Sequence, residues 1–293
     1  AWDLFPMDYY SLIRFPGVES TDRVGSVWSS RDCCYACNFC YRTNTGIRLR
    51  SPESIIEEIR ILQRDYHITS IDFMDELLMS SPSRTIELCE AFIKASLDIK
   101  WSCNGRLNFA KPEVLKIMKK SGCVFINYGI ESLDDEMLRV MNKKLTVAQI
   151  TRGIEATLAE GISPGFNIIF GNKLETKEIL WKGVEFLLKY DDHSQLRTIR
   201  PTTPYPGSDL YYYAIKNGLL KDCADFYENK LLNSDLLSVN FTDLTDDEFH
   251  SALYNANKHL IMSYYGDKLR SSLREAENLY FNKDINFRGF RQT

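Results

Sequence analysis

The sequence has no long apolar run and no excess of positive charge. Its uninterrupted apolar stretches fall far short of the roughly 20 residues that a membrane-spanning helix needs, and no basic-then-apolar signal peptide opens the chain. Lys and Arg number 36 against 40 Asp and Glu, which gives a net charge of −4. Because proteins that bind a phosphate backbone are usually basic, nucleic acid is not favoured as a partner. We expect a cytoplasmic protein without a membrane span.

The composition is that of an ordinary globular protein. Hydrophobic residues make up 44% and charged residues 26%, which argues against a disordered chain. The length of 293 residues fits about two average domains or one large α/β domain.

A disulfide framework is also missing, although the chain has eight cysteines. Four of them lie within residues 33–40, and neighbours that close rarely pair in good disulfide geometry. A chain of this length buries its own core and needs no covalent staples. We therefore interpret the clustered cysteines as reduced and metal-binding. The isolated Cys89, Cys103, Cys123 and Cys223 are expected to be small apolar core residues.

Strand-like segments alternate with helical segments along most of the chain. The predicted strands span residues 24–31, 68–74, 99–103, 124–129, 165–170 and 196–200. The predicted helices begin at 51 and 134 and span 84–96, 112–120, 147–160, 177–189 and 209–216. This alternation is typical of a parallel sheet with right-handed crossovers. Six units are too few for the usual eight-fold barrel of about 250 residues, so an open barrel and a doubly wound sheet both fit.

The chain divides into three predicted parts. Residues 1–23 are aromatic and contain proline without a clear period, and we interpret them as a linker or N-terminal extension. Residues 24–220 form the α/β domain. Residues 221–293 form a helical C-terminal region, in which 245–280 is the clearest helix.

The cysteine cluster carries the most specific signal. Cys33, Cys37 and Cys40 follow the spacing CxxxCxxC, and three thiolates in a short loop can hold one soft metal centre. A structural zinc site needs four ligands, usually as two separated pairs, and no second pair follows. Three ligands suit a 4Fe–4S cluster with one iron left open. Cys34 is either a substitute ligand or a bystander.

Residues 30–40, a strand followed by CxxxCx-aromatic-C, resemble the radical S-adenosylmethionine (SAM) superfamily. The resemblance covers roughly residues 24–220. It implies an α/β fold with parallel strands, a partial (β/α)6 TIM-like barrel, here followed by a helical C-terminal extension. It also implies a 4Fe–4S cluster on the three cysteines, bound SAM, and Phe39 near the adenine.

The same resemblance points to side chains after the second, third and fourth predicted strands. It implies that Asp75 or Glu76 holds the methionine amino group, although the family sequence there is more often Gly-Gly-Glu. Arg106 could clamp a carboxylate. Glu131 and Ser132 match a Gly-x-Glu-Ser segment and would face the ribose or amino-acid part of SAM. Each has a simpler interpretation as a helix-end acid, an ion-pair partner or a helix cap.

The implied activity is reductive cleavage of SAM to a 5′-deoxyadenosyl radical that modifies a small-molecule or natural-product substrate, with an electron donor as partner. Residues 1–10 resemble the linker that joins an upstream cobalamin-binding domain to the barrel in one branch. The Asp-x-His-x-x-Gly signature of that domain is absent here, and the chain does not start with Met. We therefore expect the chain to be the downstream part of a longer protein, and in that case C-methyl transfer with cobalamin is the leading hypothesis.

Three alternatives stay open within the superfamily: rearrangement, cyclisation and methylthiolation. Methylthiolation is less favoured because no basic RNA-binding C-terminal domain is evident. A non-catalytic iron–sulfur or zinc protein is the alternative from another class.

Overall fold

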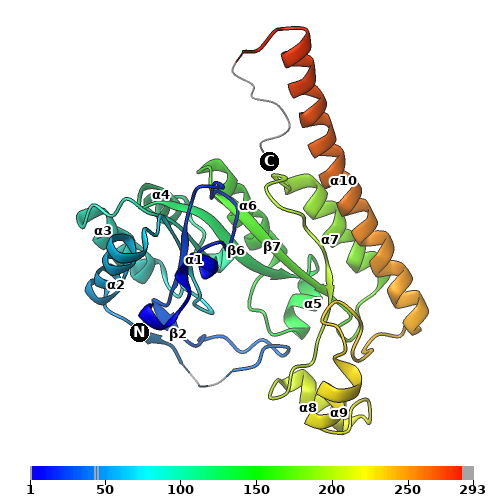
Figure 1. Ribbon diagram of the computed structural model, residues 1–293. Helices are drawn as coiled ribbons and strands as arrows, with labels where there is room; N and C mark the ends of the chain where they lie inside the picture. Colours follow the sequence, from blue (N-terminus) through cyan, green and yellow to red (C-terminus); the bar gives the residue numbers. More distant parts are fainter. Residues whose placement is uncertain (1, 43, 45, 286–293) are drawn as a thin grey trace.

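The computed structural model describes residues 2–42, 44 and 46–285. Six parallel strands form one sheet in the order β1–β4–β5–β6–β7–β8, which curves into a half-barrel (Figure 1). These strands are β1 (Val24–Val27), β4 (Ser70–Phe73), β5 (Lys100–Gly105), β6 (Cys123–Glu131), β7 (Ser163–Phe170) and β8 (Arg200–Pro201). A separate antiparallel pair consists of β2 (Ser30–Arg31) and β3 (Arg48–Leu49). The predicted partial (β/α)6 barrel is confirmed.

Helices connect the parallel strands. The α-helices are α1 (Met7–Tyr10), α2 (Pro52–Tyr66), α3 (Pro82–Lys94), α4 (Pro112–Lys120), α5 (Asp135–Val140), α6 (Val147–Ala159), α7 (Lys177–Tyr190), α8 (Asp209–Lys216), α9 (Cys223–Asp225) and α10 (Asp246–Tyr280). Two short 3₁₀ segments, η1 (Trp2–Leu4) and η2 (Leu107–Phe109), and a π-helical turn, η3 (Phe226–Lys230), complete the set in the described residues.

Local sequence sets the helix starts as expected. Ser51 caps α2 by accepting a hydrogen bond from the Ser54 amide, and Pro52 occupies the first turn, where its missing N–H costs nothing. Ile55, Ile59 and Leu62 then recur at helical spacing and are fully buried against the sheet.

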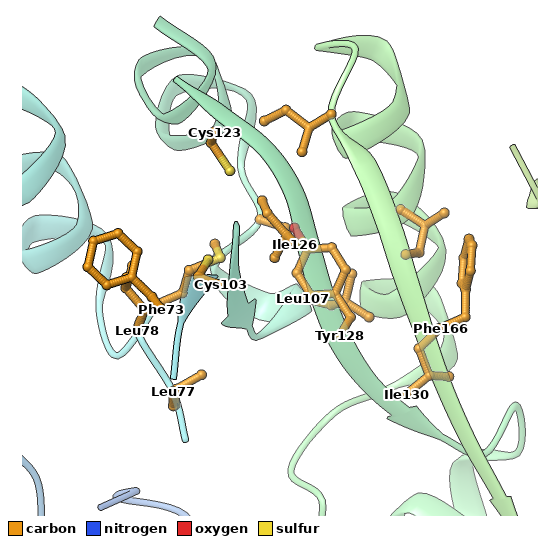
Figure 2. Close-up of a cluster of buried hydrophobic side chains, with 14 of the residues drawn as sticks. Phe73, Leu77, Leu78, Cys103, Leu107, Cys123, Ile126, Tyr128, Ile130 and Phe166 are labelled. Atoms are coloured by element: carbon orange, nitrogen blue, oxygen red, sulfur yellow. The ribbon is translucent and has the colours of Figure 1, made fainter. Parts of the chain in front are cut away.

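The core lies between the outer face of the sheet and the helices. Figure 2 shows Cys103 of β5 and Cys123 of β6 among apolar side chains that include Phe73 and Tyr128. Cys89, Cys103 and Cys123 are buried core residues, as predicted. The prediction for Cys223 is wrong, because it starts the short surface helix α9 and is exposed.

The two outermost predicted strands differ from the structure. The segment 24–31 divides into β1 and β2, because Ser29 and Ser30 turn away from the sheet toward a buried carboxylate described below. The last strand is only Arg200–Pro201, since the N–H and C=O of Ile199 bond to the Asn257 side chain of α10 rather than to β7.

The C-terminal helix is long, and only its first half is buried. Phe249, Leu253, Ala256 and Leu260 pack on the barrel, and the ring of Phe249 stacks on Phe170 with centroids 4.8 Å apart. The second half extends away from the barrel beyond α7 (Figure 1). The helical prediction for 245–280 is confirmed. The remainder of the C-terminal part, 286–293, lies outside the described residues, and the three-part division of the chain stays a prediction.

No helix among the described residues is both long and apolar enough to cross a membrane.

The aromatic centre of the core gives a stability prediction. Trp101 is fully buried, donates its indole N–H to the Ser121 carbonyl at 2.9 Å, and meets the ring of Phe73 edge-on. Trp101→Ala should lower the free energy of unfolding by about 3–5 kcal/mol, through the cavity and the unpaired carbonyl. Chemical denaturation followed by circular dichroism measures this. Leu273→Ala, on the exposed half of α10, should change it by less than about 0.5 kcal/mol; equal losses would contradict the assignment of the core.

Candidate active site

The cysteine loop leaves the barrel through a short ribbon. Ser30 pairs with Leu49 and Arg31 with Arg48, so β2 and β3 bring the two ends of the loop together. Arg48 also donates two hydrogen bonds to the Asp32 carboxylate, at 2.9 and 3.0 Å. The ribbon therefore fixes where the loop begins and ends.

Asp75 holds the start of this ribbon. Its side chain is fully buried and accepts hydrogen bonds from the Ser29 amide at 2.7 Å, the Ser29 hydroxyl at 2.5 Å and the Ser30 hydroxyl at 2.6 Å. Burial raises the pKa of Asp75, and these hydrogen bonds oppose the rise. The carboxylate after β4 is thus a structural anchor for the segment that precedes Cys33.

The far side of the loop is anchored by a different part of the barrel. The amide of Asn38 donates to the Met141 carbonyl at 3.0 Å, and the side chain of Asn142 donates to the Ala36 carbonyl at 2.5 Å. The amide of Leu210, in α8, donates to the Asn38 carbonyl at 2.9 Å. The loop is therefore held by the β2–β3 ribbon, by the segment after α5 and by α8.

A cavity of about 240 Å³ lies inside the loop, beyond the carboxyl ends of β4, β5 and β6. Its lining residues are Cys33, Tyr35, Cys37, Cys40, Tyr41, Arg42, Glu76, Leu77, Asn104, Gly105, Arg106, Asn127, Gly129, Glu131, Lys143 and Asn167. Ligands of parallel α/β barrels gather at this end of the strands.

The cavity wall beside the thiols is positively charged. The hydrogen bond from Cys40 lowers the pKa of Cys37 to about 6, assisted by the charges of Lys143 and Arg106 and opposed by burial. The same hydrogen bond raises the pKa of Cys40, and burial raises that of Cys33. Of the three thiols, Cys37 is therefore the one whose thiolate form is favoured.

Lys143 and Glu131 form a buried ion pair on this wall. The Lys143 ammonium donates to the Glu131 carboxylate at 2.7 Å, with both side chains less than a tenth exposed. Burial lowers the pKa of Lys143, but Glu131 and Cys37 outweigh it, so the net shift is upward. Glu131 adopts φ = 68°, an uncommon conformation for a residue other than glycine. Gly129 leaves room for the pair, since a Cβ there would lie 2.7 Å from the ammonium nitrogen.

Arg106 closes another side of the cavity. Its guanidinium lies 3.5 Å from the centroid of the Tyr35 ring, in the cysteine loop, and donates to the carbonyls of Lys143 and Lys144. Its Nε is buried and has no hydrogen-bond partner in the described residues. Because an unpaired buried donor is costly, this atom is a good contact point for a ligand oxygen.

The floor of the cavity is a ladder of three asparagines on adjacent strands. Asn167 of β7 donates to Asn127 of β6 at 3.0 Å, and Asn127 donates to Asn104 of β5 at 3.0 Å. Asn104 in turn donates to the backbone carbonyl of Asp75 at 2.8 Å. Gly165 leaves the space that the Asn127 amide occupies. The ladder thus connects the inside of the barrel to the anchor of the cysteine loop.

The structure brings together six of the nine residues that the sequence marks as site candidates. Cys33, Cys37, Cys40, Glu76, Arg106 and Glu131 line the cavity. The other three lie elsewhere.

Asp75, Ser132 and Phe39 are not among the lining residues. Asp75 holds the ribbon, and Ser132 is buried with its hydroxyl unpaired in the described residues. Phe39 packs against the apolar cluster around α8, and its ring lies 5.9 Å from the Lys143 ammonium.

Sequence reasoning missed Lys143, Tyr35 and the asparagine ladder. Lys143 follows α5 in a loop that has no motif of its own. The ladder is visible in the sequence, because Asn127 and Asn167 interrupt mostly apolar strands. Their positions in the strand alternation place them on the face opposite the helices.

The donor set fits a cluster better than a single ion. In the described part of the chain, no three Cys, His, Asp or Glu side chains converge on one point that a metal ion could occupy. Zinc needs its sulfurs about 2.3 Å from one atom. A 4Fe–4S cluster binds cysteines through separate irons, so three thiols spread around a cationic cavity fit it.

Comparisons with known proteins agree with this geometry. A sequence model described as the Radical SAM superfamily matches residues 29–187, and the chain belongs to that superfamily. Membership implies a 4Fe–4S cluster and SAM.

Two curated relatives are similar in sequence. An uncharacterized methyltransferase of Pyrococcus horikoshii is 34% identical over 224 residues, which are 75% of this chain and 47% of that protein. An anaerobic magnesium-protoporphyrin IX monomethyl ester cyclase of Rubrivivax gelatinosus is 27% identical over 186 residues, 62% of this chain and 33% of that protein. The chain thus spans at most about half the length of these relatives.

Among solved structures, the radical SAM methyltransferase TsrM from Kitasatospora setae superposes with a TM-score of 0.59. It shares 16% identity and covers 71% of this chain and 41% of that one, which shows a common fold.

The anchor of the loop gives a first prediction for this site. Asp75→Asn should lower the free energy of unfolding by about 2–3 kcal/mol, because a neutral amide replaces a carboxylate that accepts three buried hydrogen bonds. Thermal and urea denaturation of the metal-free chain measure this. Asp65→Asn removes an exposed ion pair with Arg64 and should leave the unfolding midpoint unchanged. An unchanged midpoint for Asp75→Asn would refute the anchoring role.

The buried ion pair gives a second prediction. Lys143→Met should destabilise the chain by about 3–5 kcal/mol, since it leaves the Glu131 charge buried and uncompensated. The double variant Lys143→Met/Glu131→Leu should recover most of that loss, because neither charge remains. Urea unfolding of both variants tests the coupling. A double variant less stable than Lys143→Met would show that the pair does not act as a unit.

Proposed function

We propose that this chain is the SAM-cleaving half-barrel of a radical SAM methyltransferase. The three thiols of the CxxxCxxC motif and two cations, Lys143 and Arg106, line one cavity at the carboxyl ends of the strands, and the proposal rests on this arrangement. A non-catalytic cluster carrier would not need an adjoining cavity with unsatisfied polar groups.

Cys33, Cys37 and Cys40 would hold the cluster. When bound and reduced, a 4Fe–4S cluster supplies the electron that breaks a carbon–sulfur bond of SAM, giving methionine and a 5′-deoxyadenosyl radical. Lys143 and Arg106 offset the negative charge of the thiolates.

The remaining cavity groups are suited to hold SAM. We assign Glu76, Arg106 and Glu131 to contacts with its amino, carboxylate and ribose groups, because all three line the cavity and Arg106 keeps an unpaired buried Nε. Asp75 and Ser132 do not line the cavity, and we assign them a positioning role rather than contact with SAM. Phe39 beside the adenine stays a prediction.

Two kinds of comparison support methyl transfer. The Pyrococcus relative and several others are named methyltransferases or methylases, and TsrM is described with cobalamin bound. A cobalamin domain would belong to protein outside this chain. Ring closure is the second candidate reaction, because two cyclases also match at 27% and 29% identity.

Anaerobic reconstitution tests the proposal. The chain, loaded with iron and sulfide and given dithionite and SAM, should form 5′-deoxyadenosine. Cys37→Ala should lose cluster iron and abolish this product, because a ligand is missing. The matched control is Cys34→Ala in the same loop, whose thiol is exposed and does not line the cavity; it should keep both.

Two results would contradict the assignment. Full iron and full product formation in Cys37→Ala would refute the ligand set, and one bound zinc with no iron would refute the cluster. In protein that also carries a cobalamin domain, formation of S-adenosylhomocysteine, rather than 5′-deoxyadenosine alone, distinguishes methyl transfer from the other reactions.

A further inference from the structure

The second half of α10 carries a row of apolar side chains on its surface. They recur at spacings of three and four residues, which places them on one face of the helix. Five of them are between 59% and 72% exposed, and the small Ala276 is partly buried. We call this row the outer stripe, and it consists of Met262, Tyr265, Leu269, Leu273, Ala276 and Tyr280. The proposed function leaves the outer stripe without a role.

The outer stripe faces away from the barrel. Leu260 is the last buried residue of α10, and Met262 follows it about 200° around the helix. Beyond Tyr264, the side of the helix that continues from Leu260 is polar. It carries Asp267, Ser271, Arg274 and Asn278. The stripe is therefore not an extension of the contact between α10 and the barrel.

The second half of α10 also makes no polar or ring contact with another helix or strand in the described part of the chain. The rings of Tyr264 and Tyr265 contact each other, the Lys268 ammonium lies over the Tyr264 ring, and Arg270 pairs with Asp267. All of these contacts lie within the helix, which extends away from the barrel (Figure 1). Since most helices in proteins are stabilised by packing of their apolar face, a stripe of this length favours a partner.

Charged residues lie along both edges of the outer stripe. Lys268 precedes Leu269 and Arg270 follows it, so the two cations lie on opposite sides of the stripe. Each cation is followed by an acid seven residues later, on its own edge. The acids are Glu275 and Glu277. The two edges thus carry the same pattern, and their charges sum to zero.

This pattern is complementary to itself when the helix direction is reversed. Two copies that pair antiparallel, centred near Ser272, bring the same edges together, with each cation about level with an acid of the other copy. In a parallel pair, each cation would instead lie level with the same cation. The outer stripe extends ten residues before Ser272 and eight residues after it, so its apolar side chains also overlap over nearly their full length in the antiparallel pair.

We propose that the outer stripe joins two copies of this chain through an antiparallel pair of α10 helices. The apolar side chains of the two stripes pack together, and the two barrels lie at opposite ends of the pair. Six side chains from each copy form a small interface, so the dimer is weak and reversible, and it dissociates in the dilute solutions used for unfolding. The cysteine cavity lies outside this contact, and the inference goes beyond the proposed function.

Sedimentation equilibrium of the purified chain tests the proposal. The average mass should rise with protein concentration toward twice the mass of one chain. Leu269→Glu should raise the dissociation constant about a hundredfold, because each dimer loses two buried leucines. The matched control is Ser271→Glu, which places the same acid on the opposite side of the helix and should leave the dissociation constant unchanged. Circular dichroism should show equal helix content in both variants.

Charge reversal tests the direction of the pair. Lys268→Glu combined with Arg270→Glu should weaken the dimer severalfold at about 0.01 M salt, and this loss should disappear at about 1 M salt. Adding Glu275→Lys and Glu277→Lys should restore the original affinity, because every antiparallel cation–acid pair is re-formed with its signs exchanged.

Two results would overturn the proposal. The first is a monomer at every concentration, and the second is equal weakening by Leu269→Glu and Ser271→Glu. A fourfold charge variant that stays as weak as the double variant would overturn the antiparallel direction.

Discussion

The site depends on one buried carboxylate. Asp75 accepts three hydrogen bonds from Ser29 and Ser30, and these bonds turn the chain out of the sheet just before the cysteine loop. These bonds are the contacts that direct Ser29 and Ser30 away from the line of β1. The Asn104 side chain binds the Asp75 backbone, so the anchor is also connected to the barrel floor. The buried Asp75 carboxylate therefore holds the start of the loop in place.

The cavity combines two demands that usually conflict. A metal-binding loop needs thiolates, and nearby cations stabilise them. Burying an unpaired cation in the cavity wall, however, costs free energy. The Glu131–Lys143 pair satisfies both, because the ammonium is neutralised by the carboxylate and still lowers the pKa of Cys37. Arg106 spreads its charge over the Tyr35 ring and two carbonyls. These contacts explain why the loop and the strand ends form one unit before any cofactor is bound.

Sequence reasoning predicted the parts of this structure that rest on local patterns. The alternation of strands and helices and the CxxxCxxC spacing are visible in the chain itself, and both led to the half-barrel. The last predicted strand, 196–200, is too long, because the N–H and C=O of Ile199 bond to the Asn257 side chain, nearly sixty residues away. The role of Asp75 and the position of Lys143 also depend on contacts between distant segments, which no periodicity records. Cys223 was misplaced because a lone cysteine has no pattern around it.

In the proposed function, Cys33, Cys37 and Cys40 would hold the 4Fe–4S cluster, and SAM would bind in the cavity beside it. Electron paramagnetic resonance of the reconstituted, dithionite-reduced chain, recorded with and without SAM, tests it most directly. We expect the spectrum of a reduced 4Fe–4S cluster, and we expect this spectrum to change when SAM is added. The same spectrum in both samples would place SAM away from the cluster and contradict the proposed function.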